Sequence, residues 1–313
     1  MLYFQATEWN YMENQFCTKI ERIQAALAQL DGQMENCRLC PRNCKIDRSN
    51  GQLGFCQLSD TARIYKYKIH TGEEPPISGT NGSGIIFFAG CTMSCAFCQN
   101  FPMSHWRQGY NVSVAELAKI MLELQSQGTH NINLVTPGHF LPSISAALLL
   151  AIEQGLRLPI VYNTNGYEKV EILRLLDGII DIYLPDMKYA EDAVAQRFSK
   201  VSNYVEVNQA AVVEMYRQVG HLVIDEQGIA QRGLIIRHLL LPNDRAGSEQ
   251  IFRFIAERLD KNIHVSLMTQ YLPIWDAKRF PEIARRVVNR ELEEVIAWME
   301  QFDLENGWMQ NLD

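Results

Sequence analysis

The chain has 313 residues, of which 47% are hydrophobic and 21% are charged, and its formal net charge is −7. This composition is typical of a globular protein with a sizeable core, and an acidic chain offers no electrostatic surface for nucleic acid. No apolar run approaches the ~20 residues needed to cross a bilayer, and the N-terminus lacks the features of a secretory signal. We therefore expect a cytoplasmic protein with neither nucleic acid nor a membrane as a partner.

Four segments are expected along the chain. Residues 1–12 contain the sequence LYFQ, which resembles a protease-site cloning remnant, so we treat them as a tag or as disordered. Residues 13–83 form an N-terminal extension, with a helix predicted over 21–30 from its apolar spacing. Residues 84–273 form the main α/β domain. Residues 274–313 form a C-terminal extension with helical spacing in WDAKRFPEIARR and again from Glu291 to Phe302.

Eight cysteines in a chain without an export signal indicate metal binding or redox chemistry rather than disulfides. Four of them, Cys37, Cys40, Cys44 and Cys56, lie in a turn-rich stretch with two glycines. Four thiolates complete either a tetrahedral zinc site or the ligand set of a [4Fe–4S] cluster, and the spacing does not separate the two. Four unligated thiols are a less favoured interpretation, and Cys17 stands alone without a predicted role.

A strand or hairpin arm is predicted over 63–70, and a turn-rich linker over 72–84 leads into the short apolar run 85–89. Cys91, Cys95 and Cys98 follow that run. Three thiolates on one loop suit three irons of a [4Fe–4S] cluster and leave the fourth iron open to an outside ligand. A zinc knuckle or buried structural cysteines are the alternatives, disfavoured because no fourth ligand falls inside the loop.

A repeating strand-then-helix pattern follows, which is typical of parallel β/α architecture. Ser113 and Glu116 form a capping box at the start of the first helix. Counting the run 85–89, six parallel strands are predicted, which would form an open, partial (β/α)6 barrel of TIM type. The later strands are expected at 132–137, 159–166, 179–188, 234–242 and 264–273, with helices around 114–127, 143–154, 172–176, 192–198, 210–217 and 249–259.

Polar residues recur at the carboxyl ends of these apolar strands. A buried polar side chain is costly without a partner, and barrel chemistry lies at this end of the strands, so the recurrence indicates a ligand site. Ordinary caps and turns are the alternative for each residue taken singly. The candidates are Thr136 and Pro137, then Asn163, Thr164 and Asn165, then Asp186 and Lys188, and finally Arg237 and His238, with His139 and His238 as candidate proton-transfer groups.

The motif C-x3-C-x-Φ-C directly after a predicted strand resembles the cluster loop of the radical S-adenosylmethionine (radical SAM) enzymes. The resemblance implies that Cys91, Cys95 and Cys98 ligate a [4Fe–4S] cluster whose open iron is chelated by S-adenosylmethionine. It also implies that Phe97 lies near the adenine, and that the fold is the partial barrel of that family. Because this loop implies cluster assembly, the N-terminal cysteines are interpreted as a second [4Fe–4S] site slightly in preference to zinc.

The segments NTNG, DMK and RH look like parts of the glycyl-radical-enzyme activases. This resemblance implies that Asn163–Asn165, Asp186 and Lys188 hold the ribose and methionine part of S-adenosylmethionine. It places Arg237 and His238 near the carboxylate or the adenine. The sequence TPGH stands where the activases have a Gly-Gly-Glu-like segment, so backbone carbonyls would have to replace that contact, with Thr136 and Pro137 as the candidate residues. CRLCPRNC, GEEPPISGT and DIYLPDMKY resemble proteins labelled as pyruvate formate-lyase activating enzyme homologues.

The resemblance implies an anaerobic oxidoreductase that receives an electron from a donor such as flavodoxin or ferredoxin. S-adenosylmethionine would be cleaved to methionine and a 5′-deoxyadenosyl radical, which abstracts hydrogen from a substrate. The substrate would be a glycyl-radical enzyme, a small molecule or a peptide. A non-catalytic iron–sulfur or zinc regulator is the rival function, disfavoured because a regulator has no need of the polar strand ends.

Overall fold

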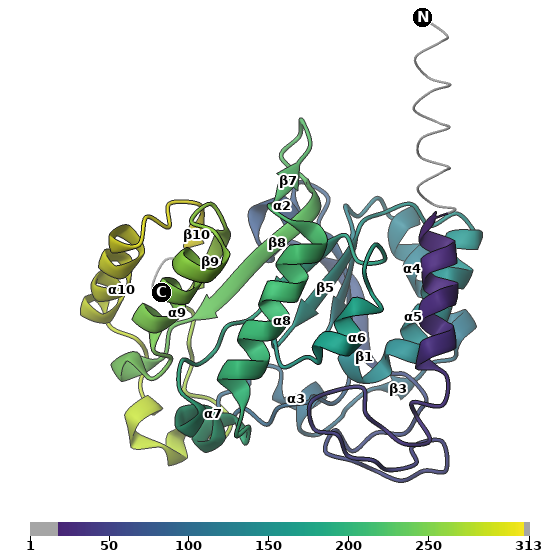
Figure 1. Ribbon diagram of the computed structural model, residues 1–313, viewed down its shortest axis with the longest axis horizontal. Helices are drawn as coiled ribbons and strands as arrows, with labels where there is room; N and C mark the ends of the chain where they lie inside the picture. The colour runs from purple at the N-terminus through teal and green to yellow at the C-terminus, as the bar shows by residue number, and fades with distance from the viewer. Residues whose placement is uncertain (1–17, 310–313) are drawn as a thin grey trace, which may run out of the picture.

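The computed structural model describes residues 18–309, and one long curved sheet lies at its centre (Figure 1). The strands lie in the order β10-β9-β8-β6-β5-β4-β2-β1-β3, with β7 paired to β8 outside this path. In chain order they are β1 (Arg63–His70), β2 (Ser83–Phe88), β3 (Tyr110–Asn111), β4 (Ile132–Val135), β5 (Ile160–Thr164), β6 (Ile182–Pro185), β7 (Val223–Ile224), β8 (Ala230–Leu239), β9 (His264–Met268) and β10 (Gly307–Met309).

The ladder from β2 through β4, β5, β6, β8 and β9 to β10 is parallel throughout, whereas β1 is antiparallel to β2 and to β3. Parallel neighbours need crossover connections, which the β/α repeats supply. The two outermost strands of the path are not paired with each other in the described chain, so the barrel stays open. The predicted partial barrel is therefore confirmed.

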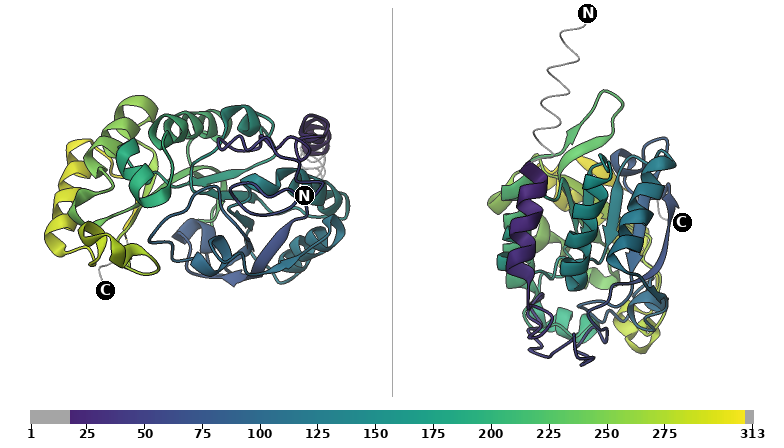
Figure 2. Two further views of the ribbon diagram at one scale, coloured as in Figure 1. Left: turned by 90° about the horizontal axis from the view of Figure 1, so that it is seen from below. Right: turned by 90° about the vertical axis from the view of Figure 1, so that its right-hand side faces the viewer.

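Helices ring the outside of the curved sheet (Figure 2). The predicted capping box starts α4, since the Ser113 hydroxyl accepts from Glu116 N while the Glu116 carboxylate accepts from Ser113 N. No helix in the described part of the chain is long and apolar enough to span a membrane. Residues 18–30 are helical, and the later helices are α2 (Pro75–Ser78), α3 (Phe101–Ser104), α4 (Val114–Ser126), α5 (Leu141–Glu153), α6 (Val170–Arg174), α7 (Asp192–Ser199), α8 (Tyr204–Val219), α9 (Ser248–Phe254) and α10 (Asn289–Gln301).

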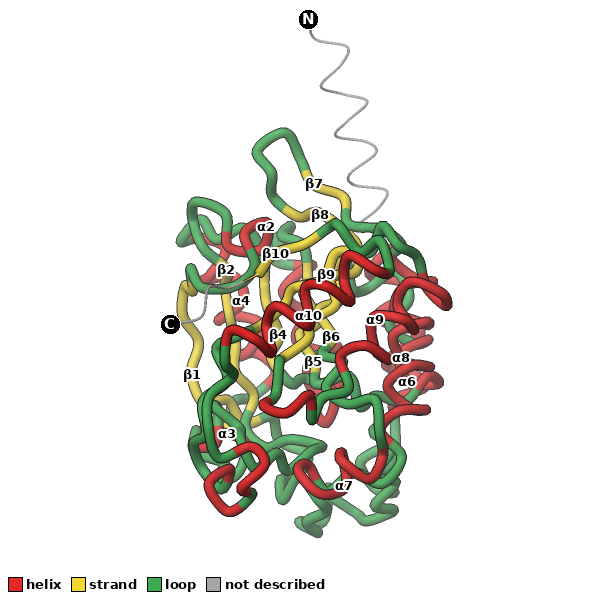
Figure 3. The backbone as a smooth tube through the Cα atoms, turned by 90° about the vertical axis from the view of Figure 1, so that its left-hand side faces the viewer, coloured by secondary structure: helices red, strands yellow, loops and turns green. Residues whose placement is uncertain are grey.

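The two ends of the barrel differ in character. At the end that carries α2, Ile77 is fully buried and packs with Val161, Ile182 and Ile235 inside the sheet, so apolar side chains close this end. At the opposite end lie α3, α7 and most of the long loops, including the segment that holds the N-terminal cysteines (Figures 1 and 3). This second end is the carboxyl end of the parallel strands, where barrel enzymes place their chemistry.

Some elements differ from the sequence predictions. The helical spacing of 275–286 gives only two 3-10 turns, Ala277–Arg279 and Pro281–Ile283, because Pro281 interrupts any longer helix. Neither β10 nor the short hairpin of β7 with β8 was predicted, and α8 begins at Tyr204 rather than at Ala210. Residues 31–62 contain neither helix nor strand, as the turn-rich sequence indicates.

Candidate functional site

A loop with three cysteines leaves the carboxyl end of β2 and packs against the end of α7. Gly90 opens this three-cysteine loop (residues 89–98) with a φ of +76°, and a Cβ there would lie 2.5 Å from Leu58 Cδ1. The N-terminal extension therefore requires a glycine at this position. Ser94 N donates to Ser199 O at 3.0 Å, which fixes the middle of the loop to the last residue of α7.

Each of the three sulfurs is in contact with a polar group from a different element. Because these contacts come from separate parts of the fold, the barrel positions all three side chains. Hydroxyl and amide donors also favour a thiolate over a thiol. The partner atoms are Asn165 Nδ2 for Cys91 (3.2 Å), Ser199 Oγ for Cys95 (3.0 Å) and Ser104 Oγ for Cys98 (3.1 Å).

Burial decides the protonation of these thiols. Together with a smaller contribution from the neighbouring Cys95, it raises the pKa of Cys91 to about 12 and the pKa of Cys98 to about 11. At neutral pH the free loop therefore carries thiols, and a bound cation has to displace their protons. Three buried sulfurs on one loop, two of them accepting from side-chain donors, match the soft, thiolate-binding character of an iron–sulfur cluster.

Four predicted strand-end residues meet beside this loop in one buried network. Arg237 donates from Nη2 to Asn163 Oδ1 at 2.6 Å and from Nε to Asp186 Oδ1 at 3.0 Å. Lys188 Nζ donates to Asp186 Oδ2 at 2.5 Å. Burial alone would favour the neutral acid, yet the two cations hold the pKa of Asp186 below its usual range. Lys188 also lies close enough to Cys95 for the two to interact electrostatically.

Two acids that the sequence did not single out extend this network. Glu73 Oε2 lies 3.6 Å from Arg237 Nη1, and burial raises the pKa of Glu73 to about 7. Glu74 Oε2 and both amide atoms of Asn133 are buried without a hydrogen-bond partner in the described structure. The acids belong to GEEPP, whose turn-forming residues indicated only a linker, so no sequence signal placed them near Arg237.

Other predicted residues lie elsewhere. Thr164 points to the outer side of β5, where its hydroxyl donates to Glu168 Oε1 at 2.5 Å. His238 is fully buried between Met187 O (2.8 Å) and Ser248 Oγ (2.9 Å), away from the three-cysteine loop. These positions do not support contacts with S-adenosylmethionine. They also make His238 a poor candidate for proton transfer.

Phe97, Thr136 and Pro137 do lie around the carboxyl ends of the strands. Phe97 is 5% exposed, and its ring lies 5.6 Å from that of Tyr271 and 6.5 Å from that of Tyr189. The backbone N–H of Thr136 donates to Asn163 O at 2.8 Å. Thr136 has a φ of +57°, so the chain turns here before the 3-10 helix that follows Pro137. Among these three, Thr136 is half-buried, whereas Phe97 and Pro137 are buried.

The four N-terminal cysteines line one small cavity. Arg42, Arg48, Thr92 and His139 line the same cavity. Burial raises the pKa of the Cys40 and Cys56 thiols. Across residues 18–309, no three His, Cys, Asp or Glu side chains are arranged to hold one metal ion.

His139, a predicted proton-transfer candidate, belongs to this cavity and not to the barrel mouth. It is 2% exposed, and burial together with the Arg48 guanidinium lowers its pKa to about 3. Arg48, itself 1% exposed, donates to His139 O at 2.7 Å and lies 3.8 Å from Cys37 Sγ. The proton-transfer role is not supported, because the imidazole stays neutral and buried.

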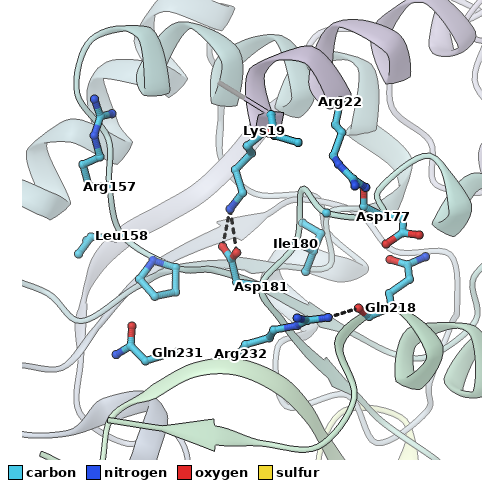
Figure 4. Close-up of a pocket in the computed structure, with 13 residues that line it drawn as sticks. Lys19, Arg22, Arg157, Leu158, Asp177, Ile180, Asp181, Gln218, Gln231 and Arg232 are labelled. Atoms are coloured by element: carbon cyan, nitrogen blue, oxygen red, sulfur yellow. Dashed lines mark hydrogen bonds and ion pairs between the residues drawn. The ribbon is translucent and has the colours of Figure 1, made fainter. Parts of the chain in front are cut away.

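A separate hollow of about 650 Å³ lies at the amino ends of the strands (Figure 4). Its centre is occupied by an ion pair in which Lys19 Nζ contacts both carboxylate oxygens of Asp181, at 2.7 and 2.8 Å. Asp181 also accepts from Ile160 N at 2.8 Å. These charges are paired within the fold and lie at the face of the barrel that usually serves stability.

Comparisons with known proteins agree with this geometry. The chain matches the family model of the radical SAM superfamily over residues 85–226. It is 31% identical over 279 residues to an uncharacterised protein of Methanocaldococcus jannaschii, covering 87% of this chain and 76% of that protein.

Two solved structures are also similar. One is Streptococcus suis SuiB bound to precursor peptide SuiA, with a TM-score of 0.50 and 13% identity over 71% of this chain and 47% of that chain. The other is a radical SAM methyltransferase from Sphaerobacter thermophilus, with a TM-score of 0.48 and 15% identity over 71% of this chain and 63% of that chain. This chain thus spans less than two thirds of either solved chain. The family model and the Methanocaldococcus relative show that the chain belongs to the radical SAM superfamily, whose members use a [4Fe–4S] cluster and S-adenosylmethionine.

Proposed function

We propose that this protein cleaves S-adenosylmethionine reductively, with a [4Fe–4S] cluster held by Cys91, Cys95 and Cys98. The observation that carries the proposal is the three-cysteine loop itself, with its buried, individually partnered sulfurs at the carboxyl end of β2. When bound, the cluster and S-adenosylmethionine supply one-electron cleavage of a C–S bond, giving methionine and a 5′-deoxyadenosyl radical. That radical takes a hydrogen atom from the substrate.

The protein's own residues orient the cofactor and exclude water. Asn165, Ser199 and Ser104 hold the sulfurs through the contacts described above. The buried network of Asn163, Asp186, Lys188 and Arg237 offers positive and negative side chains for a zwitterionic amino acid. It also offers hydrogen-bonding groups for a ribose. We assign this network to the methionine and ribose part and Phe97 to the adenine, with Thr136 and Pro137 beside them. Thr164 and His238 are left out because of their positions.

The proposal also includes a class of substrate and an electron donor. Activation of a glycyl-radical enzyme remains one candidate reaction, supported by the NTNG, DMK and RH segments. Modification of a small molecule or a peptide is the other, and it is supported by the fold shared with SuiB, whose structure contains a bound precursor peptide. A flavodoxin or ferredoxin is the proposed electron donor.

An anaerobic assay tests the proposal. The full chain is reconstituted with iron and sulfide, reduced with dithionite, and incubated with S-adenosylmethionine. We expect 5′-deoxyadenosine and methionine in equal amounts, together with a change in the electron paramagnetic resonance (EPR) spectrum of the reduced cluster when S-adenosylmethionine binds. An assembled cluster that neither responds to S-adenosylmethionine nor yields deoxyadenosine would favour a non-catalytic iron–sulfur protein.

A further inference from the structure

Two buried side chains reach from the N-terminal cysteine cavity to the backbone on either side of Cys91. Arg42 Nε donates to Thr92 O at 2.8 Å, one residue after Cys91. His139 Nε2 lies 2.7 Å from Ala89 O, and it must be the donor because a carbonyl oxygen only accepts. Both side chains line the cavity with the four cysteines. Side chains that line the N-terminal cysteine cavity are therefore hydrogen-bonded to the three-cysteine loop.

Each of these side chains also has a buried atom with nothing to bind. Arg42 Nη2 and His139 Nδ1 have no hydrogen-bond partner in the described structure. The Arg42 guanidinium cannot easily turn away, since it lies 3.6 Å from the centre of the Phe55 ring and its Nε is already bonded. Buried polar atoms are nearly always paired, and an unpaired one costs ~1–3 kcal/mol. Arg42 Nη2 therefore lacks an acceptor, whereas His139 Nδ1, in the neutral tautomer that donates from Nε2, lacks a donor or a metal ion.

The contents of the cavity would supply the acceptor atom that Arg42 Nη2 lacks. A zinc ion with four thiolates adds none, and its ~2.3 Å bonds would draw the sulfurs to within about 4 Å of one another. A [4Fe–4S] cluster adds inorganic sulfides, and hydrogen bonds to cluster sulfurs help to set its reduction potential. All four N-terminal cysteines line this one cavity, so they can provide the four ligands of such a cluster.

We propose that the N-terminal cysteine site holds an iron–sulfur cluster, and that Arg42 and His139 couple this cluster to the loop that carries Cys91. The coupling rests on the proposed function only in that Cys91 is taken as a ligand of the cofactor cluster. It continues beyond Thr92, because Asn165 Nδ2 donates both to Thr92 Oγ1 at 3.0 Å and to Cys91 Sγ at 3.2 Å. A displacement of Thr92 therefore disturbs a hydrogen bond to the ligand sulfur.

The identity of the N-terminal metal is tested in a variant without the three-cysteine loop's ligands, carrying Cys91→Ser, Cys95→Ser and Cys98→Ser. After anaerobic reconstitution we expect about four irons and four sulfides per chain, and an EPR signal on reduction that S-adenosylmethionine leaves unchanged. Zinc without iron at this site would overturn the proposal. This measurement does not depend on cleavage, so failure of the proposed function would leave it intact.

The coupling is tested with Arg42→Lys, which keeps the positive charge but loses the forked guanidinium. Arg38→Lys, at an exposed arginine of the same segment, is the matched control. We expect Arg42→Lys to shift the reduction potential of the N-terminal cluster to more negative values. We also expect S-adenosylmethionine to bind about tenfold more weakly, because about one charged hydrogen bond is lost. The change in the EPR spectrum on binding measures this affinity. The control should match the wild type.

Two results would overturn the coupling. One is an Arg42→Lys protein that equals Arg38→Lys in both the potential and the binding. The other is loss of iron from the N-terminal site with no change at the cofactor cluster. Loss of that iron together with weaker S-adenosylmethionine binding would support the link, since Arg42 is bonded to Thr92 next to Cys91. If the wild-type protein never responds to S-adenosylmethionine, the proposed function is contradicted instead. The reduction potential of the N-terminal cluster would still test whether Arg42 contacts that cluster.

Discussion

The two cysteine sites of this chain obtain their geometry in different ways. The three-cysteine loop follows a barrel strand, and its sulfurs meet side chains from the ends of β5, α3 and α7. The N-terminal site lies within residues 31–62, where backbone bonds such as Cys37 N to Ile46 O (2.9 Å) tie the segment to itself. The first site is built by the fold, whereas the second is built by a segment with no regular structure of its own.

This contrast indicates how much each site would depend on the metal proposed for it. A loop held by helix and strand ends keeps its shape with or without a cofactor. A segment without helix or strand gains much of its order from bound metal, as in small metal-binding domains. Arg48 is the main exception, because its buried guanidinium fastens Leu58 O and His139 O at 3.1 and 2.7 Å. Metal loss should therefore loosen the N-terminal segment before it affects the barrel.

The sharpest test of the contrast removes one cysteine from each site. We expect Cys98→Ala to abolish deoxyadenosine formation, because only two loop ligands remain for the cofactor cluster. Cys44→Ala should retain part of the activity, since the loop keeps its own three ligands. Product formation and iron content after anaerobic reconstitution are the measurements. Complete loss in a folded Cys44→Ala protein with its first cluster intact would mean that both sites are essential for cleavage.

Within the barrel, Asp186→Asn should lower the rate of deoxyadenosine formation by roughly 10- to 100-fold, because even a small displacement of a bound cofactor slows the reaction. Asn cannot balance the charges of Lys188 and Arg237, which both contact Asp186. Asp181→Asn is the matched control, since Asp181 lies just before the same strand but at the opposite end, paired with Lys19. Equal losses in the two variants would argue for a general effect of charge on folding instead of a role at the site.

Sequence reasoning reached the barrel and the cysteines because both have local signals. Caps such as Ser113 and β/α repeats define the elements, and thiol spacing defines the ligand sets. Sequence reasoning failed where a residue's position depends on contacts between distant parts of the chain. Strands buried on both faces show no alternation, so Thr164 and His238 could not be assigned to the outer face. β10 has three residues, too few for any periodicity, and Glu73 reaches Arg237 from a turn-rich linker.

A smaller effect is expected from Ser199→Ala, which removes the hydroxyl 3.0 Å from Cys95 Sγ. Fewer donors to a ligand sulfur should shift the cofactor cluster to a more negative reduction potential and slow cleavage several-fold. Tyr189 contacts the same hydroxyl at 2.6 Å, so Tyr189→Phe should give a weaker change in the same direction. Spectroscopic redox titration measures both. If the two variants kept the wild-type potential, the fold would position the sulfurs without tuning them.

The smallest effect on chemistry is expected far from both cysteine sites, at the start of α10. Glu291 accepts from Arg285 Nη2 at 2.6 Å and from Asn243 N at 2.6 Å, and the Arg285 contact lowers its pKa to about 2. A pKa lowered in the folded state gives stability that is complete above the ordinary value near 4.5 and disappears as the pH falls toward 2. Glu291→Gln should therefore reduce the free energy of unfolding by ~1–3 kcal/mol at pH 7, and by progressively less in acid, with deoxyadenosine formation unchanged. Denaturant titrations across this pH range measure the difference. A difference that stays constant down to pH 3 would mean that the charge of Glu291 is not what holds the helix.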